Sequence, residues 1–349
     1  MRQQKPPLKE IMRITGLSRA TIDRALNGRE GVHPRTRTTV DAALHKLGEA
    51  ADASPSASPR DCLRHYKAVV QVGDAFTQSI IEEVARLKPL LVARNCTLEV
   101  LPCVGIPSEH VAEIIQAQAK ADGLLIIAKN TAEIADAAIM FREQGKAIVA
   151  LHTDLDLAAR HAYVGIDNRA AGQTVGFLMG RHMAPDSAAN LAVIVEAMNY
   201  RCHEEREMGF RSVLRQRFPS LNLIEIVKHD DSAEASYVAV KSLLESFPHL
   251  DGIYNTAGGN QGVARALAEY ERTGKTLFVT HEYNRVTETL IRQHEVDYLI
   301  TQNMKHMMLE AVDQLSAVLS AESYSPQVLI PLEILCHYSL PPTIASDAA

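Results

Sequence analysis

The chain has 349 residues, of which 46% are hydrophobic and 22% are charged, and its net charge is −6. This length exceeds one small core and predicts two or three globular domains. No apolar run approaches the roughly 18 residues that a membrane span needs, and the basic N-terminal segment has no apolar core of a secretory signal behind it. We therefore expect a cytoplasmic protein without a membrane partner.

The net charge is unevenly distributed along the chain. Residues 1–50 carry ten Lys or Arg and five Asp or Glu, so this segment has a charge of +5 and the remainder has a charge of −11. A cationic head on an acidic body is the distribution expected when the head alone binds phosphate groups.

Three short helices are predicted within the cationic head. Residues 8–15 have the apolar spacing of a first helix. Ser18 is a good N-cap for the second helix, in which Ile22 and Leu26 lie four residues apart on one apolar face. The third helix follows in residues 33–47. Two helices joined by a tight turn and followed by a third indicate a helix-turn-helix DNA-binding unit, and a purely structural bundle would not explain the surplus of cations.

Residues 8–48, LKEIMRITGLSRATIDRALNGREGVHPRTRTTVDAALHKLG, resemble without gaps the headpiece of the lactose-repressor (LacI/GalR) transcription regulators. The similarity includes the Gly-Leu-Ser turn, the Thr-Ile-x-Arg-x-Leu-Asn-Gly recognition helix and the Arg-Thr-Arg start of the third helix. The resemblance implies that Arg19, Ala20 and Arg24 read bases in the major groove. Residues that could contact phosphate are Ser18, Thr21, Asn27 and Thr36.

Residues 51–65 are predicted to link the headpiece, residues 1–50, to the body, residues 66–341. The stretch 49–60 is small and polar and contains two prolines, so burial cannot offset its ordering cost. Family members normally carry a hinge helix here, whose leucine enters the minor groove. In this chain no leucine follows until Leu63, so binding would depend more on the headpieces and on dimer avidity.

Short apolar strands and amphipathic helices alternate from about residue 66. Residues 67–73 form a strand, residues 79–95 a helix and residues 96–104 a second strand, and the pattern continues to a last strand at residues 296–303. This alternation predicts an α/β fold in which helices cover both faces of parallel sheets.

The body carries four segments that resemble the effector domain of the same regulators and the ribose-type periplasmic sugar-binding proteins. These segments are YVGIDNRAAG (163–172), ER-x-x-GF (205–210), DGIYN (251–255) and ITQN (300–303). The resemblance implies two doubly wound lobes that are joined by three crossovers and hold a ligand between them. Lobe one is expected at roughly residues 66–165 plus 304–319, and lobe two at roughly residues 167–300 plus 320–341.

Ligands of open parallel sheets bind beyond the carboxyl ends of the strands. Candidate effector-binding residues, chosen by that rule and by the resemblance, are Asp74, Phe76, His152, Asp154, Asp167, Arg206, Thr256, Asn260, Glu282 and Gln302. Arg206 matches an arginine that sugar-binding relatives aim into the cleft, and its planar fork can hold two hydroxyls, a carboxylate or a phosphate. The aspartate–arginine pair that is usual near His152 is missing, which argues against plain ribose recognition.

Structural roles are the alternatives for these side chains. Arg206 could form a surface ion pair with Glu205 or Glu207. Helix N-caps would account for Asp74, Asp167 and Glu282, and Phe76 could belong to the core.

We expect a sequence-specific transcription regulator of repressor type, controlled by a sugar, polyol or related metabolite. Its partners would be double-stranded operator DNA and a second copy of the chain, in a homodimer or a tetramer. The alternative is a sugar transport receptor, which would share the body but has no use for the headpiece.

An enzyme is disfavoured by the sequence. The chain has no nucleophile elbow and no complete phosphate loop, and its five cysteines are scattered without metal-ligand spacing. We therefore expect no catalytic residues, no cofactor, no metal and reduced thiols.

Overall fold

The computed structural model describes residues 63–183, 188–196, 200–228 and 232–340, and eight isolated residues before them. The chain divides into two compact units, residues 1–62 and residues 63–349. In the first unit the Ser18 hydroxyl accepts a hydrogen bond from the Thr21 amide, as expected of an N-cap. Most of the predicted headpiece, Ala20, Arg24 and Asn27 included, and the predicted linker as far as Cys62 lie outside the described residues.

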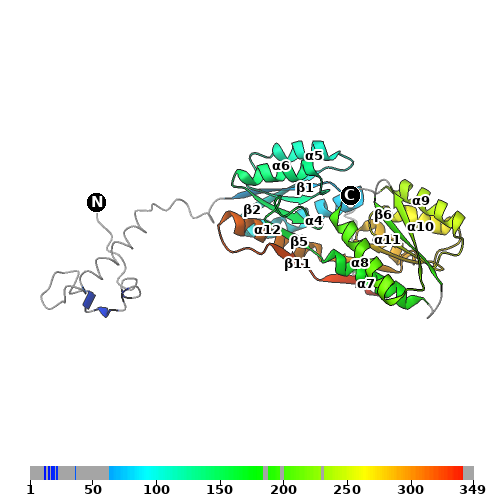
Figure 1. Ribbon diagram of the computed structural model, residues 1–349. Coiled ribbons are helices and arrows are strands. Elements are labelled where there is room, and N and C mark those ends of the chain that lie inside the picture. The colour runs from blue at the N-terminus through cyan, green and yellow to red at the C-terminus, as the bar shows by residue number, and fades with distance from the viewer. Residues whose placement is uncertain are drawn as a thin grey trace. The chain divides into compact units, whose positions relative to one another are not determined.

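Lobe one is built on a six-stranded parallel sheet in the order β11-β5-β4-β3-β1-β2. Its elements are β1 (Arg64–Val70), α4 (Asp74–Ala93), β2 (Cys96–Pro102), α5 (Ser108–Gln116), β3 (Gly123–Ile127), α6 (Ala132–Glu143), β4 (Ala147–Leu151), β5 (Ala162–Gly165), α12 (Met304–Leu319) and β11 (Gln327–Leu329). Helices α4 and α12 cover one face of this sheet, and α5 and α6 cover the other (Figure 1).

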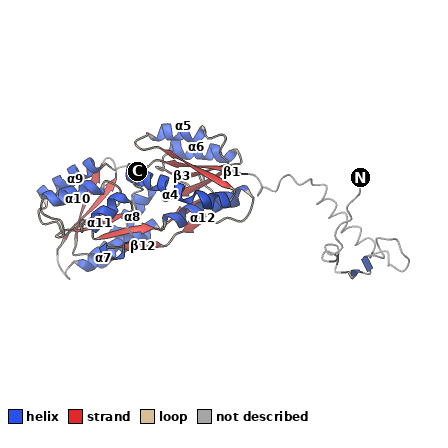
Figure 2. Ribbon diagram, turned by 180° about the vertical axis from the view of Figure 1, so that it is seen from behind, coloured by secondary structure: helices blue, strands red, loops and turns tan. Residues whose placement is uncertain are grey.

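Lobe two is built on a second six-stranded sheet in the order β12-β10-β9-β8-β6-β7, in which only the edge strand β12 is antiparallel. Its elements are α7 (Asn168–His182), β6 (Asn190–Glu196), α8 (Arg201–Arg217), β7 (Asn222–Lys228), α9 (Ala233–Ser246), β8 (Gly252–Asn255), α10 (Asn260–Glu269), β9 (Leu277–His281), α11 (Arg285–Arg292), β10 (Tyr298–Gln302), β12 (Leu332–Leu335) and the 3-10 turn η1 (His337–Ser339). Figure 2 shows helices flanking the strands of both lobes.

The chain passes between the lobes three times, after β5, after β10 and after β11. The prediction of two doubly wound lobes is therefore confirmed, with two corrections to its bounds. Residues 320–341 were expected in lobe two, but β11 pairs with β5 of lobe one, and only β12 joins the second sheet. Arg64 and His65 were expected in the linker, but they already pair with β2. β11 is a short edge strand whose partly exposed residues have no apolar pattern, and Arg64 and His65 are the polar, partly exposed first residues of the internal strand β1.

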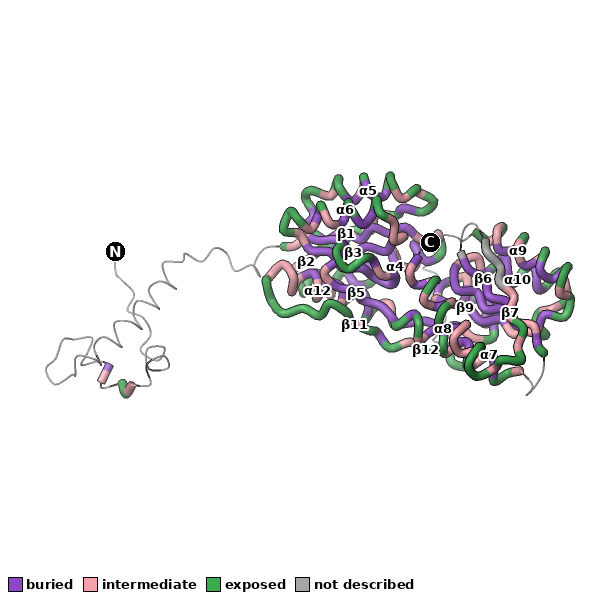
Figure 3. The backbone as a smooth tube through the Cα atoms, viewed as in Figure 1, coloured by how far each residue is buried: buried purple, intermediate pink, exposed green. Residues whose placement is uncertain are grey.

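The core of each lobe is divided by its sheet into two layers. The central strands β3 and β4 are buried along their whole length, which explains their continuous apolar sequences. Figure 3 shows this inner position of the strands under more exposed helices. Among the described residues, no helix has both the length and the apolar character that a bilayer crossing requires.

Helices α7 and α8 approach each other closely because glycines line their contact. A Cβ atom at Gly172 would collide with the backbone oxygen of Arg206, and one at Gly209 would collide with the backbone oxygen of Arg169. Alanine at either position would therefore force the two helix backbones apart. The contact fixes the position of α8, and with it the residues that α8 contributes to the boundary between the lobes.

We predict that Gly172→Ala destabilises lobe two by about 1–3 kcal/mol, because overpacking forces the helices apart. In an ordinary helix interior the same change would be stabilising, so the sign is diagnostic. Urea denaturation followed by circular dichroism measures the free energy of unfolding. Replacement of the exposed Gln173 on the same helix by alanine is the control and should change stability by less than about 0.5 kcal/mol. Equal stabilities of wild type and Gly172→Ala would contradict the packing argument.

Candidate functional site in the cleft between the lobes

A cleft with a volume of about 870 Å³ separates the two lobes. Its walls are formed at the carboxyl ends of the strands and at the first turns of the following helices, as in other open parallel sheets. Polar and aromatic residues of lobe one in its lining are Gln71, Asp74, Phe76, Lys129, His152 and Thr153. Those of lobe two are Tyr200, Cys202, His203, Arg206, Ser232, Asn260, Gln261, His281, Glu282 and Asn284.

Arg206 on α8 is 1% exposed, and its guanidinium binds three groups of lobe two. Its Nε donates to Asn168 Oδ1 at 2.8 Å, its Nη1 to the Thr256 carbonyl oxygen at 3.0 Å and its Nη2 to Glu282 Oε1 at 2.9 Å. Burial alone would lower the pKa of Arg206, but Cys202 and Glu282 raise it above its ordinary value. Arg206 therefore remains charged and joins α7, the end of β8 and the end of β9.

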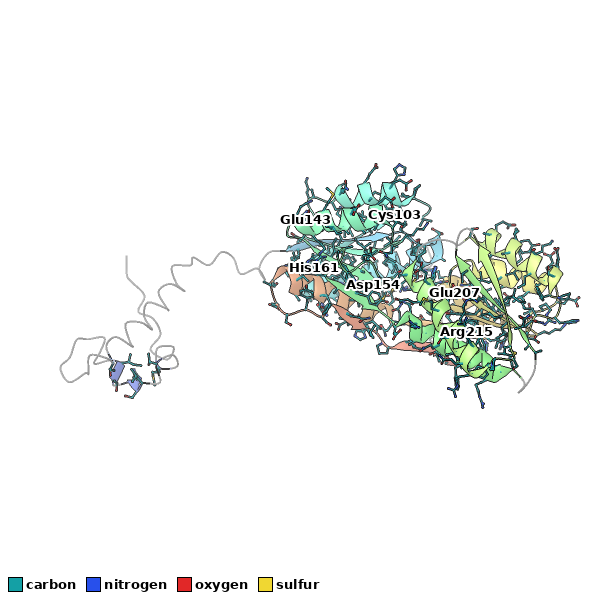
Figure 4. All side chains as sticks on the ribbon, in the orientation of Figure 1. Cys103, Glu143, Asp154, His161, Glu207 and Arg215 are labelled. Carbon is teal, nitrogen blue, oxygen red and sulfur yellow. The ribbon has the colours of Figure 1, made fainter. Side chains whose placement is uncertain are left out.

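The structure does not support the alternative of a surface ion pair for Arg206. Glu207 instead pairs with Arg211, Nε to Oε1 at 2.6 Å, and Glu205 pairs with Arg201 at 3.5 Å. Figure 4 labels Glu207 and Arg215 on α8, along with Asp154 in lobe one.

Two left-handed backbone positions bring side chains of opposite lobes together. His152 directly follows β4 and has a φ of 66°, and Glu282 directly follows β9 and has a φ of 67°. Such values are uncommon for residues other than glycine and cluster at functional sites. His152 Nε2 lies 3.7 Å from Glu282 Oε1, and His152 Nδ1 lies 2.9 Å from Gln302 Nε2.

Carboxylate oxygens without a partner among the described residues lie on both sides of the cleft. Asp74 begins α4, and its carboxylate accepts no hydrogen bond from the residues that the structure describes. Glu282 accepts the hydrogen bond from Arg206 with Oε1, and its Oε2 has no partner among the described residues. The Phe76 ring packs against His152 at a centroid distance of 4.6 Å. The cleft thus offers two hydrogen-bond acceptors and an aromatic face.

His281 is a buried polar side chain on the same wall. Its Nε2 lies 2.7 Å from the hydroxyl of Tyr254, and its Nδ1 has no hydrogen-bond partner among the described residues. Burial lowers the pKa of His281 well below its ordinary value, and the charges of Arg206, His203 and His152 lower it further. The imidazole is therefore neutral near pH 7, with one ring nitrogen still to be satisfied.

Of the ten predicted effector-binding residues, six line the cleft: Asp74, Phe76, His152, Arg206, Asn260 and Glu282. The hydrogen-bonding capacity of the Asn260 side chain is partly used within the protein, because its Oδ1 accepts hydrogen bonds from Asn255 Nδ2 and Thr280 Oγ1.

The other four predicted residues are absent from the cleft lining, each for a structural reason. Asp154 forms a two-point ion pair with the buried Arg160. Asp167 caps α7, as its alternative role required. The remaining two are strand-end residues that turn inward. Thr256 Oγ1 donates to the Ile194 carbonyl oxygen. The Gln302 amide forms a hydrogen bond with His152 Nδ1.

Sequence reasoning missed the cleft residues contributed by the start of α8. Tyr200, Cys202 and His203 follow β6, so the rule that ligands bind beyond strand ends applies to them as well. His281 ends β9 directly before Glu282, so the same rule also points to it. Lys129 follows β3 and was overlooked at an equally suitable position.

A family model described as "Periplasmic binding protein domain" matches residues 107–323. The chain belongs to this family. No curated protein matches the sequence.

The periplasmic binding protein domain also resembles solved structures of similar size. GanP, a glucose-galactose binding protein from Geobacillus stearothermophilus, is 19% identical, with a TM-score of 0.70 over 80% of this chain and 99% of that chain. A solute binding protein from Burkholderia graminis in complex with D-arabinose is 18% identical, with a TM-score of 0.71 over 79% and 96%. A putative LacI transcriptional regulator from Bacteroides fragilis is 12% identical, with a TM-score of 0.69 over 79% and 97%. At these identities the likeness concerns the fold.

We predict that Glu282→Gln lowers the free energy of unfolding by about 3 kcal/mol, because it leaves the buried Arg206 without a counter-charge. Chemical denaturation of the purified protein measures this change. Asp74→Asn is the matched control: its carboxylate has no partner in the described structure, so stability should change by less than about 0.5 kcal/mol. If both variants were as stable as the wild type, Arg206 would not depend on Glu282.

Proposed function

We propose that the two-lobed domain binds a small polyhydroxylated solute, a sugar or a polyol, in the cleft between its lobes. The observation that carries this proposal is the presence on both walls, on Asp74 and on Glu282, of carboxylate oxygens that no described residue engages. A carboxylate accepts up to two hydroxyl hydrogens at once, and charge-assisted bonds of this type are strong. The Phe76 ring adds an apolar surface against which the C–H face of a sugar ring could pack.

The charge balance favours a neutral ligand over an acidic one. Arg206 is neutralised by Glu282 within its own lobe, so it adds no net positive charge to the cleft. The remaining charges of the lining are Lys129 and Asp74, which balance each other. The solute binding protein from Burkholderia graminis was solved with D-arabinose, a neutral pentose, which supports the same ligand class.

We predict that one or more of D-arabinose, D-glucose, D-galactose and ribitol raises the melting temperature of the full chain, since a ligand that binds only the folded state stabilises it by mass action. Asp74→Asn should lower the affinity for whichever solute stabilises the chain by about tenfold or more, because it removes a charge-assisted hydrogen bond. Scanning fluorimetry and titration calorimetry measure the two effects.

Glu109→Gln, an exposed acid on α5 that does not line the cleft, is the control and should leave affinity unchanged. Equal weakening by both variants would contradict a role for Asp74 in binding.

We further propose that this binding domain controls a DNA-binding headpiece, so that the chain is a cytoplasmic transcription regulator. The supporting observation is the ungapped resemblance of residues 8–48 to LacI/GalR headpieces, together with their excess of cations. Differential affinity of the ligand for the DNA-competent and DNA-incompetent states would couple the two modules. A homodimer, or a tetramer of two dimers, would then read a near-palindromic operator as a repressor.

The alternative function is a sugar transport receptor. The comparisons taken alone favour it, because the glucose-galactose binding protein and the arabinose-bound solute binding protein share the fold. The two functions make different demands on residues 1–50: a regulator needs them for DNA, whereas a transport receptor does not. DNA binding and cellular location therefore separate the two functions.

We predict that the full chain selects genomic fragments over random duplex DNA in a mobility-shift assay. Arg24→Ala should cost about 1–3 kcal/mol of specific binding, because it removes a base contact. Arg86→Ala, an exposed change on α4 of the binding domain, is the matched control and should bind as the wild type does. Wild-type chain that bound no fragment selectively and fractionated outside the cytoplasm would favour the transport receptor.

A further inference from the structure

His281 is the last residue of β9 and lines the cleft directly before Glu282. The residue is 2% exposed. Its Nε2 forms a hydrogen bond of 2.7 Å with the hydroxyl of Tyr254, whereas its Nδ1 is buried and has no hydrogen-bond partner among the described residues. Buried polar atoms are paired in the great majority of cases, so an unpaired one on the wall of a ligand cleft points to a partner that the ligand supplies.

The imidazole of His281 is neutral, so only one of its two nitrogens carries a hydrogen. Burial lowers the pKa of His281 well below its ordinary value, and the charge of Arg206 lowers it further. In the described part of the chain, no carboxylate is hydrogen-bonded to the ring to favour the imidazolium form.

Tyr254 determines which nitrogen of His281 carries that hydrogen. The Tyr254 ring is buried in the core of lobe two and packs on Phe210 at a centroid distance of 4.8 Å. Within the described ranges, its hydroxyl has no acceptor other than His281 Nε2. If Nε2 carried the hydrogen, the hydroxyl hydrogen and Nδ1 would both be unpaired. A hydroxyl that donates to Nε2 leaves a single unpaired group, a hydrogen-bond donor at Nδ1.

A second tyrosine–histidine pair in lobe two shows the same hydrogen-bond pattern in complete form. The Tyr298 hydroxyl lies 3.2 Å from His182 Nε2, and His182 Nδ1 lies 2.8 Å from the Leu178 carbonyl oxygen. Because a carbonyl oxygen can only accept, Nδ1 of His182 carries a hydrogen, and Nε2 of the neutral ring accepts from Tyr298. At His281 the tyrosine is present, but no described residue provides the oxygen that Leu178 provides for His182.

The two carboxylates of the cleft make the opposite demand on a solute. The oxygens of Asp74 and Glu282 that no described residue engages can only accept, so each requires a hydroxyl hydrogen. The Nδ1–H of His281 requires the lone pair of an oxygen, which a hydroxyl, a ring oxygen or a carbonyl group can provide. The cleft wall therefore specifies both donors and an acceptor in its solute.

We propose that His281 is a specificity-determining residue of the cleft, whose Nδ1–H donates a hydrogen bond to one oxygen of the bound solute. This assignment rests on the proposed function, because it takes the solute to be a sugar or a polyol. A buried donor without a partner keeps its desolvation cost, so the cleft rejects an analogue that lacks this oxygen even where the analogue fits the space. His281 thus selects solutes by the presence of an oxygen at one position.

Titration calorimetry with the full chain tests the assignment. The probes are D-arabinose, D-glucose, D-galactose and ribitol, each with its mono-deoxy analogues and, for the cyclic sugars, the analogue with CH₂ in place of the ring oxygen. We expect at least one analogue to bind about tenfold or more weakly than its parent. In His281→Phe/Tyr254→Phe, which replaces both partners of the buried hydrogen bond by apolar rings of similar shape, this ratio should fall below about threefold.

Two further double variants separate a ligand contact from a structural effect. His182→Phe/Tyr298→Phe removes the complete pair, which does not line the cleft, and should keep every wild-type ratio. His281→Asn/Tyr254→Phe should restore part of the lost discrimination, because the asparagine amide nitrogen and histidine Nδ1 both lie two bonds beyond Cβ. Ratios that stayed unchanged in His281→Phe/Tyr254→Phe would overturn the assignment, since the carboxylates alone would then produce them.

Nitrogen-15 NMR of the ligand-free full chain with labelled histidine tests the donor without any solute, and needs no variant to fold. At about pH 8, where ordinary histidines are neutral, we expect a hydrogen on Nδ1 of His281 and none on Nε2, as for His182. A hydrogen on Nε2 would overturn this proposal and leave sugar binding intact. The expected NMR result in a chain that binds none of the four solutes would contradict the proposed function, and the role of His281 in binding with it.

Discussion

The buried ion pair between Arg206 and Glu282 is the interaction on which the cleft depends. Burying either charge alone would carry a large desolvation cost, and the two charges neutralise each other in the buried wall of the cleft. Arg206 also holds Asn168 of α7 and the carbonyl of Thr256 after β8. Glu282 occupies a left-handed backbone position that few residues other than glycine adopt, and its bond to Arg206 offsets that cost.

The close packing of α7 on α8 prepares this arrangement. Gly172 and Gly209 let the two helix backbones approach, which brings Arg206 within reach of Asn168. The same placement of α8 carries Tyr200 and Cys202 to the boundary with lobe one. A packing contact of two glycines that do not themselves line the cleft therefore determines which side chains the two lobes can present to each other.

The fold could be predicted from the alternation of apolar strands and amphipathic helices, and its crossovers followed from the family resemblance. The edge strands could not be assigned, because β11 and β12 are short and partly exposed and lie only two residues apart, so no pattern separates their sheets. The rule that ligands bind beyond strand ends located six cleft residues. It failed for Thr256 and Gln302, since a position at a strand end does not specify whether the side chain turns inward or outward.

The role of Arg206 shows a similar limit of sequence reasoning. Its place in the cleft was predictable, but its use was not, because the partner Glu282 lies 76 residues away and turns toward Arg206 through an unusual backbone angle. The sequence presented Arg206 as a group for the ligand. In the structure Arg206 holds together α7 and the ends of β8 and β9 in the cleft wall. The oxygens of Asp74 and Glu282 that no described residue engages are then available to a solute.

A crystal structure of the full chain with the most strongly stabilising sugar or polyol tests this account most directly. The account predicts the solute in the cleft, with hydroxyls bonded to the Asp74 carboxylate and to Glu282 Oε2, while Arg206 keeps its bonds to Glu282 Oε1 and Asn168. A solute bound outside the cleft, or an Arg206 that had released Glu282 to grip the solute, would contradict it.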